Sequence, residues 1–329
     1  WADGFHYTIR YWEIWNEPEV GRQQMWSGTP EEFYNLYDVT AKHLKACFPH
    51  LKIGGYANCG FTAITPRMEL NPETGRVEPV PPLPIEYNTI NFFLGFMEYI
   101  KAHNSPIDFF SWHIYAHEVE KIADKAKRVR ALLDQYGYTQ TESILNEWNY
   151  VSGWTDDDIV YSHDHRGKVK GAAFSAAAMC ACQYSSVDML MYYDARPNEF
   201  WNGMFDDTVV GRVLKGYYPF PMFHALYQLE NCVHAEADEV GGYICAAKNS
   251  DQAAVLLTHF NDNDTTNPKN FIIDLSGFYG ENGVEVEFYL LDETHNCDLV
   301  GKVTYYSNRF IPELILPNFS CYLLKLKKK

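Results

Sequence analysis

Two glutamates lie in segments rich in aromatic residues and have the types and context for acid–base or nucleophilic chemistry. Glu17 is part of the tetrapeptide Trp15–Pro18, and Glu147 is part of Asn146–Asn149. Each directly follows an asparagine. Hydrolysis of a glycosidic bond requires two carboxyl groups, one as proton donor and one as nucleophile or base. A lone glutamate at a strand end is more often a salt-bridge partner or a rim residue, but the matched pair favours the catalytic interpretation.

The elements that must position this pair alternate between strand and helix patterns over residues 10–230. Strands are predicted at 10–17, 51–57, 107–115, 143–148 and 187–193, with helices at 29–48, 89–103, 118–136, 168–184 and 219–230. This alternation predicts βαβ units and a parallel sheet, about five units of a (β/α) TIM-type barrel. Segments 60–87 and 151–166 are expected to be loops, the first as part of a substrate rim.

Beyond residue 231 the pattern changes to short strands separated by turn residues. Strands are predicted at 242–248, 252–260, 270–275, 284–291, 299–306 and 319–326. This spacing is typical of an antiparallel β-sandwich. We therefore expect a partial-barrel catalytic domain at 1–231 and a β-sandwich domain at 232–329.

Both glutamates are predicted at the C-terminal ends of parallel strands, the edge where barrels of this kind place their chemistry. Trp15–Pro18 is similar to the Asn-Glu-Pro motif of a large clan of retaining glycosidases, in which the acid/base ends strand 4 and the nucleophile ends strand 7. If Glu17 ends strand 4, counting onward places Glu147 at the end of strand 7.

Within that clan the chain most resembles glycoside hydrolase family 39, the family of β-xylosidases and α-L-iduronidases. The matching segments cover most of the chain: Tyr11–Pro18, Ser111–Tyr115, Asn146–Asn149 and Lys215–Tyr227. Residues Tyr192–Arg196 depart from the tryptophan-containing pattern expected on strand 8, so the identity of the sugar stays open. Here Asp194 and Arg196 form either a local ion pair or a substrate contact.

The resemblance implies a role for each site residue. Glu17 would be the general acid and then the general base, and Glu147 the nucleophile that forms a glycosyl-enzyme. Asn16 would bind the sugar 2-hydroxyl. His113 and Tyr115 would line the floor of the site, and the alternative is a packed aromatic strand end. The candidates for stacking on sugar rings, each also suited to a structural role, are Trp148, Tyr192, Trp201 and Phe205. No cofactor and no metal are expected.

The barrel count is incomplete, because a full barrel has eight units and the pattern supplies five. By the count from Glu17, strands 1 to 3 are absent. Strands 10–17 and 187–193 would then be exposed apolar edges, which invite pairing with another chain. We expect a homo-oligomer that closes the open side of the barrel, or a chain that is a fragment of a longer enzyme. Because the sequence starts at Trp1 without a methionine, its natural beginning, including any signal peptide, is expected to be missing.

The interpretation that fits best is a retaining β-glycosidase acting on plant-type oligosaccharides, with a β-xylosidase as the first candidate and a small carbohydrate as its substrate. One alternative is the same chemistry on an arabinoside or a glucoside. The other is a catalytically weak or inactive carbohydrate-binding or assembly protein derived from such an enzyme.

The amino-acid composition limits the classes of molecule that the chain is expected to bind. The net charge is −16, from 43 acidic and 27 basic residues, which argues against nucleic acid and against anionic membranes as partners. The 16% aromatic content fits a large aromatic core or a sugar site. The 8 cysteines form no C-x-x-C pair, so free thiols and a reducing, cytoplasmic location are expected.

Overall fold

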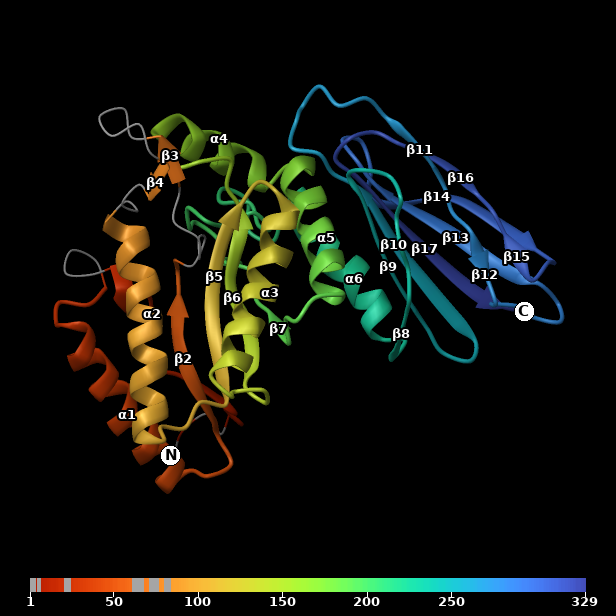
Figure 1. Ribbon diagram of the computed structural model, residues 1–329. Coiled ribbons are helices and arrows are strands. Elements are labelled where there is room, and N and C mark those ends of the chain that lie inside the picture. Colours follow the sequence, from red (N-terminus) through yellow and green to blue (C-terminus); the bar gives the residue numbers. More distant parts are fainter. Residues whose placement is uncertain (1–3, 5–6, 21–24, 61–67, 71–76, 80–83) are drawn as a thin grey trace. The chain divides into compact units, whose positions relative to one another are not determined.

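The computed structural model describes residues 4, 7–20, 25–60, 68–70, 77–79 and 84–329 (Figure 1). The chain divides into two compact units. The first comprises Trp1–Ile114, Asp124–Trp148 and Ser186–Met191, and the second comprises Tyr115–Ala123, Asn149–Ser185 and Tyr192–Lys329. The domain boundary predicted near residue 231 rests on the change in sequence pattern, whereas the two compact units interleave along the chain. The predicted boundary stays a prediction.

A five-stranded, curled half-barrel sheet carries the N-terminal part of the fold. Its order is β1-β2-β5-β6-β7, and the pairings of β1 with β2, β2 with β5 and β6 with β7 are parallel. The bounds are β1 Tyr11–Glu13, β2 Lys52–Asn58, β5 Phe109–Ala116, β6 Glu142–Tyr150 and β7 Met189–Leu190. The five strands expected from the sequence are confirmed.

Strand β1 is shorter than the predicted strand 10–17. Ile14 still donates its amide to the carbonyl of Gly54 at 2.9 Å. Trp15 and Glu17 then take φ values of 72° and 46°, a left-handed region that few residues other than glycine adopt. The extended backbone therefore ends before Glu17, which enters the short 3-10 helix η1 at Pro18–Val20.

Helices α1 (Pro30–Cys47) and α2 (Pro84–His103) pack beside β2 through aromatic side chains (Figure 1). Thr29 caps α1 with the expected proline in the first turn, and it forms a capping box with Glu32. Tyr56 of β2 makes edge contacts with the rings of Phe92 and Phe96, at 5.2 and 4.9 Å between centroids. Much of the aromatic content of this unit therefore serves its core.

The polar segment 151–166 is mostly helical, so its prediction as a loop was wrong. Helix α4 spans Asp156–Arg166 and begins with a capping box between Thr155 and Asp158. The other helices are α3 Val119–Gln135, α5 Val169–Gln183, η2 Lys215–Tyr217 and α6 Pro219–Tyr227. The expected rim at 60–87 lies largely outside the described residues, apart from a small hairpin of β3 (Met68–Leu70) and β4 (Val77–Pro79).

The C-terminal residues form antiparallel sheets in the second unit. A six-stranded sheet has the order β14-β13-β17-β10-β9-β8, and two-stranded sheets pair β11 with β16 and β12 with β15. The bounds are β8 Asn231–Val233, β9 Gly242–Lys248, β10 Gln252–His259, β11 Lys269–Ile272, β12 Leu275–Ser276, β13 Val284–Leu291, β14 Asn296–Tyr305, β15 Arg309–Phe310, β16 Glu313–Leu316 and β17 Ser320–Lys328. A shared core joins the sheets, with Phe271 and Leu316 of the small sheets packed among Val255, Val284 and Leu324.

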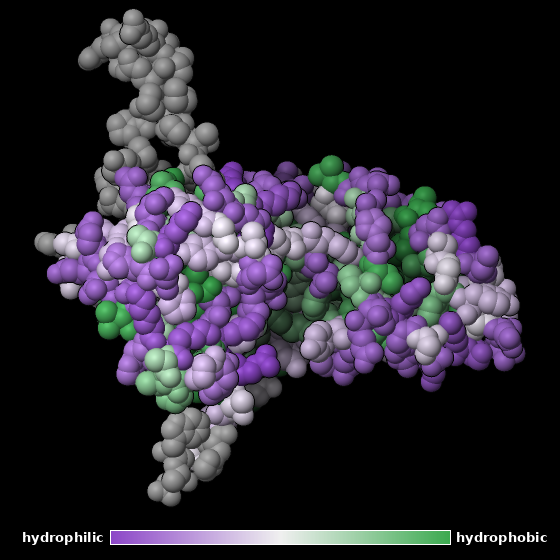
Figure 2. All heavy atoms as spheres, turned by 60° about the horizontal axis from the view of Figure 1, so that its bottom comes forward, coloured by the Kyte–Doolittle hydropathy of each residue, from purple (hydrophilic) through white to green (hydrophobic). Residues whose placement is uncertain are grey.

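The face of the molecule seen in Figure 2 is mainly hydrophilic. Figure 2 shows polar and charged side chains over most of the visible face, with hydrophobic side chains in smaller patches. No helix in the described part of the chain is long and apolar enough to cross a membrane. All 8 cysteines fall within the described residues, and each is a free thiol.

Candidate active site

Glu17 lies where the chain leaves β1 and enters η1. Its backbone amide donates to the carbonyl of Ala57 at 3.2 Å, which ties this turn to the end of β2. The backbone of Ala57 is also left-handed, with φ of 59°. The side chain of Glu17 is 16% exposed, so its carboxyl group is sheltered but reachable.

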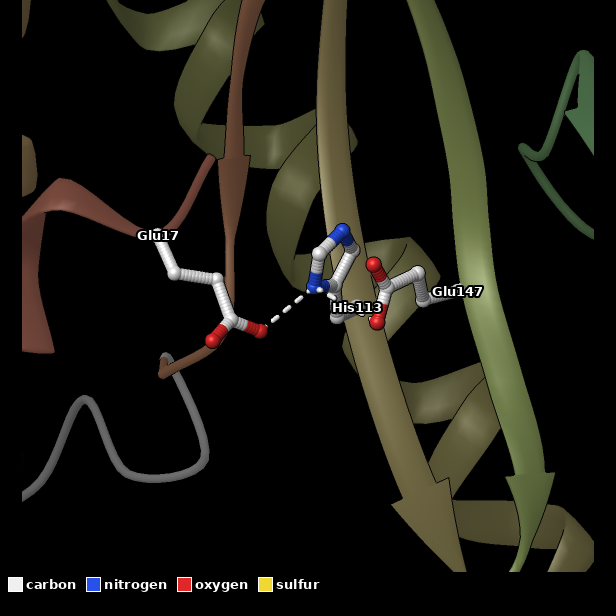
Figure 3. Close-up of side chains that lie close together, drawn as sticks. All are labelled: Glu17, His113 and Glu147. Carbon is white, nitrogen blue, oxygen red and sulfur yellow. Dashed lines mark hydrogen bonds and ion pairs between the residues drawn. The ribbon is translucent and has the colours of Figure 1, made fainter. Parts of the chain in front are cut away.

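His113 of β5 connects Glu17 to the second predicted carboxylate. Its ring is 1% exposed, and its Nδ1 atom lies 2.6 Å from Oε1 of Glu17. The same nitrogen lies 3.5 Å from Oε2 of Glu147. Figure 3 shows the imidazole between the two carboxylates, with Glu17 on the turn after β1 and with His113 and Glu147 on the strands β5 and β6.

Glu147 completes this arrangement from β6, with its side chain 20% exposed. One carboxylate oxygen of Glu17, one of Glu147 and a nitrogen of His113 all lie within 4.8 Å of one another. The turn after β1 and the C-terminal half of β6, two strands that β2 and β5 separate in the sheet, thus deliver two carboxyl groups to one place. Such a pair, with an imidazole between, can donate a proton, accept one and attack an electrophilic carbon.

A third carboxylate, Glu13 of β1, is close to this group and was missed in the sequence. Its Oε1 accepts a hydrogen bond from Nδ2 of Asn146, the residue before Glu147, at 2.8 Å. Desolvation of the carboxyl group raises the pKa of Glu13, and the charge of Glu147 adds to this, whereas Ser111, His113 and Asn146 oppose it. The available signal was its position four residues before the end of the predicted strand 10–17, a spacing that puts Glu13 and Glu17 on the same face of a strand.

Comparison with known proteins shows the family. The model of glycosyl hydrolases family 39 matches residues 6–302. The chain belongs to glycoside hydrolase family 39. A β-xylosidase of Geobacillus stearothermophilus is 24% identical over 162 residues, which is 43% of this chain and 26% of that protein. The aligned part thus spans about a quarter of the length of this relative.

Solved structures of glycosidases share the fold. A glucosidase from Croceicoccus marinus matches with a TM-score of 0.75 and 21% identity, over 100% of this chain and 71% of that one. A monomeric β-xylosidase from Caulobacter crescentus CB15 matches with a TM-score of 0.67 and 14% identity, over 96% of this chain and 69% of that one. At these identities the likeness describes the fold of the family 39 chain and leaves its substrate open.

Two other predicted site residues lie in the same compact unit as Glu17. Asn16 immediately precedes Glu17 and is partly buried. Trp148 follows Glu147, but its side chain is 1% exposed, so its ring is part of the protein core. For both residues, contact with a sugar stays a prediction.

The remaining predicted site residues of this family 39 chain lie in the second unit, where each packs against other aromatic or cationic side chains. The rings of Tyr115 and Trp201 are 4.6 Å apart, and the guanidinium of Arg166 lies 4.4 Å from the ring of Trp201. Tyr192 packs edge-on against Phe220 at 5.4 Å. Their contact with substrate stays a prediction.

Phe205, also in the second unit, contacts the ring of Tyr217 at 6.0 Å, and its sugar contact likewise stays a prediction. Arg196 and Asp194 form an ion pair at 2.7 Å, which is one of the two alternatives expected for them.

The group of Glu17, His113 and Glu147 also has the donor set of a possible metal site. Two carboxylates and an imidazole suit several divalent transition metals. Because these are also the two predicted catalytic carboxylates, a metal ion bound here would occupy the place of the substrate.

Proposed function

We propose that the chain is a retaining glycoside hydrolase that cleaves β-xylosides by double displacement. The observation that supports this is the approach of the Glu17 and Glu147 carboxylates, whose nearest ligand oxygens lie within 4.8 Å. Retaining glycosidases hold their two carboxyl groups about 5–5.5 Å apart, whereas inverting enzymes leave about 6.5–9.5 Å for a water molecule. The short separation favours retention.

In the proposed reaction Glu17 is the acid and Glu147 the nucleophile. The proton of Glu17 passes to the glycosidic oxygen as the carboxylate of Glu147 attacks the anomeric carbon, so the aglycone leaves as an alcohol. Glu17, now ionised, takes a proton from water, and the resulting hydroxide oxygen displaces Glu147 from the sugar. His113 contacts both carboxylates and can orient each in turn.

Two sugars are supported as substrates. The similarity to a β-xylosidase favours a xyloside, while the fold match with a glucosidase favours a glucoside as the second candidate. The candidate sugars can be ranked by the kcat/KM of one enzyme preparation on 4-nitrophenyl β-D-xyloside, β-D-glucoside and α-L-arabinoside. The highest kcat/KM on the xyloside is the expected result, and a preference for the glucoside would replace it.

Variants of the two carboxylates test the mechanism. Glu147→Ala should abolish turnover, and azide should restore it with formation of a glycosyl azide of inverted configuration. Glu17→Ala should retain cleavage only of substrates with good leaving groups. Turnover that survives unchanged in both variants would overturn the assignment, and a wild-type protein that binds sugars but cleaves none would favour the carbohydrate-binding alternative.

We also propose that the chain self-associates through the β1 edge of its half-barrel. In the described sheet β1 has only β2 as a neighbour, and apolar side chains near this edge are exposed: Tyr7 at 68%, Ile9 at 45%, Trp12 at 45% and Trp15 at 46%. Exposed apolar edges favour pairing. Light scattering at micromolar concentration should show a dimer or larger species, and a monomer would contradict this.

The antiparallel sheets of residues 232–329 are proposed to form the β-sandwich domain expected from the sequence. The shared core between the six-stranded sheet and the two small sheets supports this. A fragment of residues 232–329 that unfolds cooperatively would agree with an independent domain, and an unfolded fragment would contradict it.

A further inference from the structure

A buried carboxylate, Glu19, holds the turn that carries Glu17. Glu19 lies in η1, two residues after Glu17, and is 4% exposed. Its Oε1 accepts hydrogen bonds from Nδ2 of Asn58 at 2.9 Å and from the backbone amides of Cys59 at 2.7 Å and Gly60 at 3.5 Å. These donors come from the last residue of β2 and the two that follow. Glu19 therefore fastens the Glu17 turn to the end of β2.

A buried lysine, Lys125 of α3, holds the strand that carries His113. It is 3% exposed. Its Nζ donates to the carbonyl of His113 at 2.7 Å and also to the carbonyl of Gly60. Gly60 thus receives Lys125 at its carbonyl and Glu19 at its amide. A buried ammonium needs such acceptors because desolvation penalises its charge.

These contacts form a closed circuit around the Glu17–His113 hydrogen bond. On one side, Glu17 is followed by Pro18 and Glu19 in η1, and Glu19 accepts a hydrogen bond from the amide of Gly60. On the other side, Lys125 donates to the carbonyl of Gly60 and to the carbonyl of His113. The circuit closes at the 2.6 Å contact between the two side chains. Glu19 binds the backbone amides after β2 and Lys125 binds the backbone carbonyl of His113, so both act on the site through the backbone that they hold.

The turn needs such support because its backbone is unfavourable by itself. Trp15, Glu17 and Ala57 all have positive φ values, of 72°, 46° and 59°. Non-glycine residues in this region persist only where the surrounding structure holds them. The hydrogen bonds of Glu19 lie directly beside this strained segment.

We propose that Glu19 and Lys125 are positioning residues that keep Glu17 within hydrogen-bonding distance of His113, an inference that rests on the proposed role of Glu17 as acid/base. Loosening either contact would weaken the 2.6 Å hydrogen bond between Glu17 and His113, and it would affect Glu147 less because that carboxylate lies 3.5 Å from the same nitrogen. Proton donation would then suffer more than nucleophilic attack.

Leaving-group dependence tests this directly, measured as kcat/KM on phenyl and 2,4-dinitrophenyl glycosides of the preferred sugar. Departure of dinitrophenolate needs no proton, whereas departure of phenolate does. For Glu19→Ala and Lys125→Met we expect kcat/KM to fall roughly tenfold or more on the phenyl glycoside, given the sensitivity of catalysis to small displacements. On the dinitrophenyl glycoside we expect it to stay within about twofold of wild type.

Two control variants separate positioning from general damage. Glu19→Gln keeps an oxygen acceptor for the amides and should restore most of the activity on the phenyl glycoside. Lys170→Met removes an equally buried lysine, also 3% exposed, whose Nζ bonds Asp262 and Asp264 elsewhere in the chain. It should lower stability without changing the leaving-group dependence. Equal losses on both substrates in Glu19→Ala and Lys125→Met would overturn the proposal.

A second readout needs no turnover. The ¹⁵N resonance of His113 Nδ1, assigned with His113→Ala, should shift in Glu19→Ala and Lys125→Met but stay near its wild-type position in Glu19→Gln. If wild type cleaves no glycoside, the proposed function fails, while this resonance still decides the positioning role. An unchanged resonance in Lys125→Met would overturn it, even if Glu19→Ala does not fold.

Discussion

His113 and Glu17 share a hydrogen bond of 2.6 Å whose direction follows from the surroundings of the histidine ring. The other ring nitrogen, Nε2, is buried and has no hydrogen-bond partner among the described residues. A buried N–H without a partner is rarer and costlier than an unpaired acceptor. The neutral ring is therefore best satisfied with its proton on Nδ1, donating to Oε1 of Glu17. This leaves Oε2 of Glu17 to carry the proton that the substrate receives.

Removing this donor should weaken catalysis without removing a catalytic carboxylate. Hydrogen bonds to charged groups contribute about 1.5–3 kcal/mol, so His113→Ala should lower kcat roughly 10- to 150-fold. Steady-state kinetics on the phenyl glycoside measures this. Ile114→Val, at the next position of β5 and facing the opposite side of the strand, serves as the control for general damage. A kcat within about twofold of wild type would show that His113 only fills space.

Divalent zinc should inhibit by competing with substrate. The ligand atoms of Glu17, His113 and Glu147 lie within 4.8 Å of one another, and zinc accepts both imidazole and carboxylate donors. Because zinc needs the lone pair of Nδ1, its binding would break the hydrogen bond between His113 and Glu17. Inhibition kinetics should show a higher KM with an unchanged kcat, and EDTA should reverse it. Inhibition that persists fully in His113→Ala would place the zinc elsewhere.

The sequence predicted the convergence of Glu17, His113 and Glu147 because it depends on a topological rule. Parallel strands in successive βαβ units end at the same edge of the sheet, and the curl of a barrel turns these ends toward a common centre, so residues near the ends of strands that are not neighbours can meet. The local backbone of Glu17 was not predictable in this way. Its positive φ, and that of Trp15, arises where no glycine signals it, so the predicted strand ran four residues beyond the end of β1.

Contacts that depend on a single side chain reaching a distant backbone were also beyond the sequence. Nothing in the segment around Glu19 indicates that its carboxylate meets the amides after β2, since 39 residues separate it from Asn58. Helix α4 is a different case, because a signal was present. The capping box of Thr155 with Asp158 could have been recognised, but the polar composition of 151–166 favoured a loop and outweighed it.

Glu13 should orient Asn146, the residue that precedes the proposed nucleophile Glu147. Its hydrogen bond with Asn146 at 2.8 Å fixes the side chain that precedes Glu147. Glu13→Ala frees that amide and should lower kcat/KM by roughly tenfold on both phenyl and dinitrophenyl glycosides, since nucleophilic attack is common to both. Glu13→Gln keeps an oxygen acceptor and should be milder. A loss confined to the phenyl glycoside would indicate that Glu13 acts on Glu17 instead.

The buried Glu19 should make folding stability depend on pH. Burial raises the pKa of Glu19 to about 7, with the charge of Glu17 adding to the shift and the amides of Cys59 and Gly60 opposing it. Because the folded-state value lies above that of the unfolded chain, the folded state holds this proton more tightly. Its contribution to stability is present at low pH and is lost as pH rises toward 7.

The glutamine side chain of the Glu19→Gln variant cannot ionise, so this variant should not lose stability at position 19 as pH rises. Between pH 5 and pH 8 the free energy of unfolding of the variant should improve relative to wild type by about 2 kcal/mol. Tyr56, whose hydroxyl group interacts electrostatically with Glu19, is present in both proteins. Burial lowers the pKa of Lys125 to about 8 and the charge of Glu19 partly opposes this, so the difference between the two proteins reports the carboxyl group together with its effect on Lys125. Urea unfolding at both pH values measures the difference. A gap between the two proteins that does not change with pH would mean that Glu19 is ionised in the folded state throughout this range.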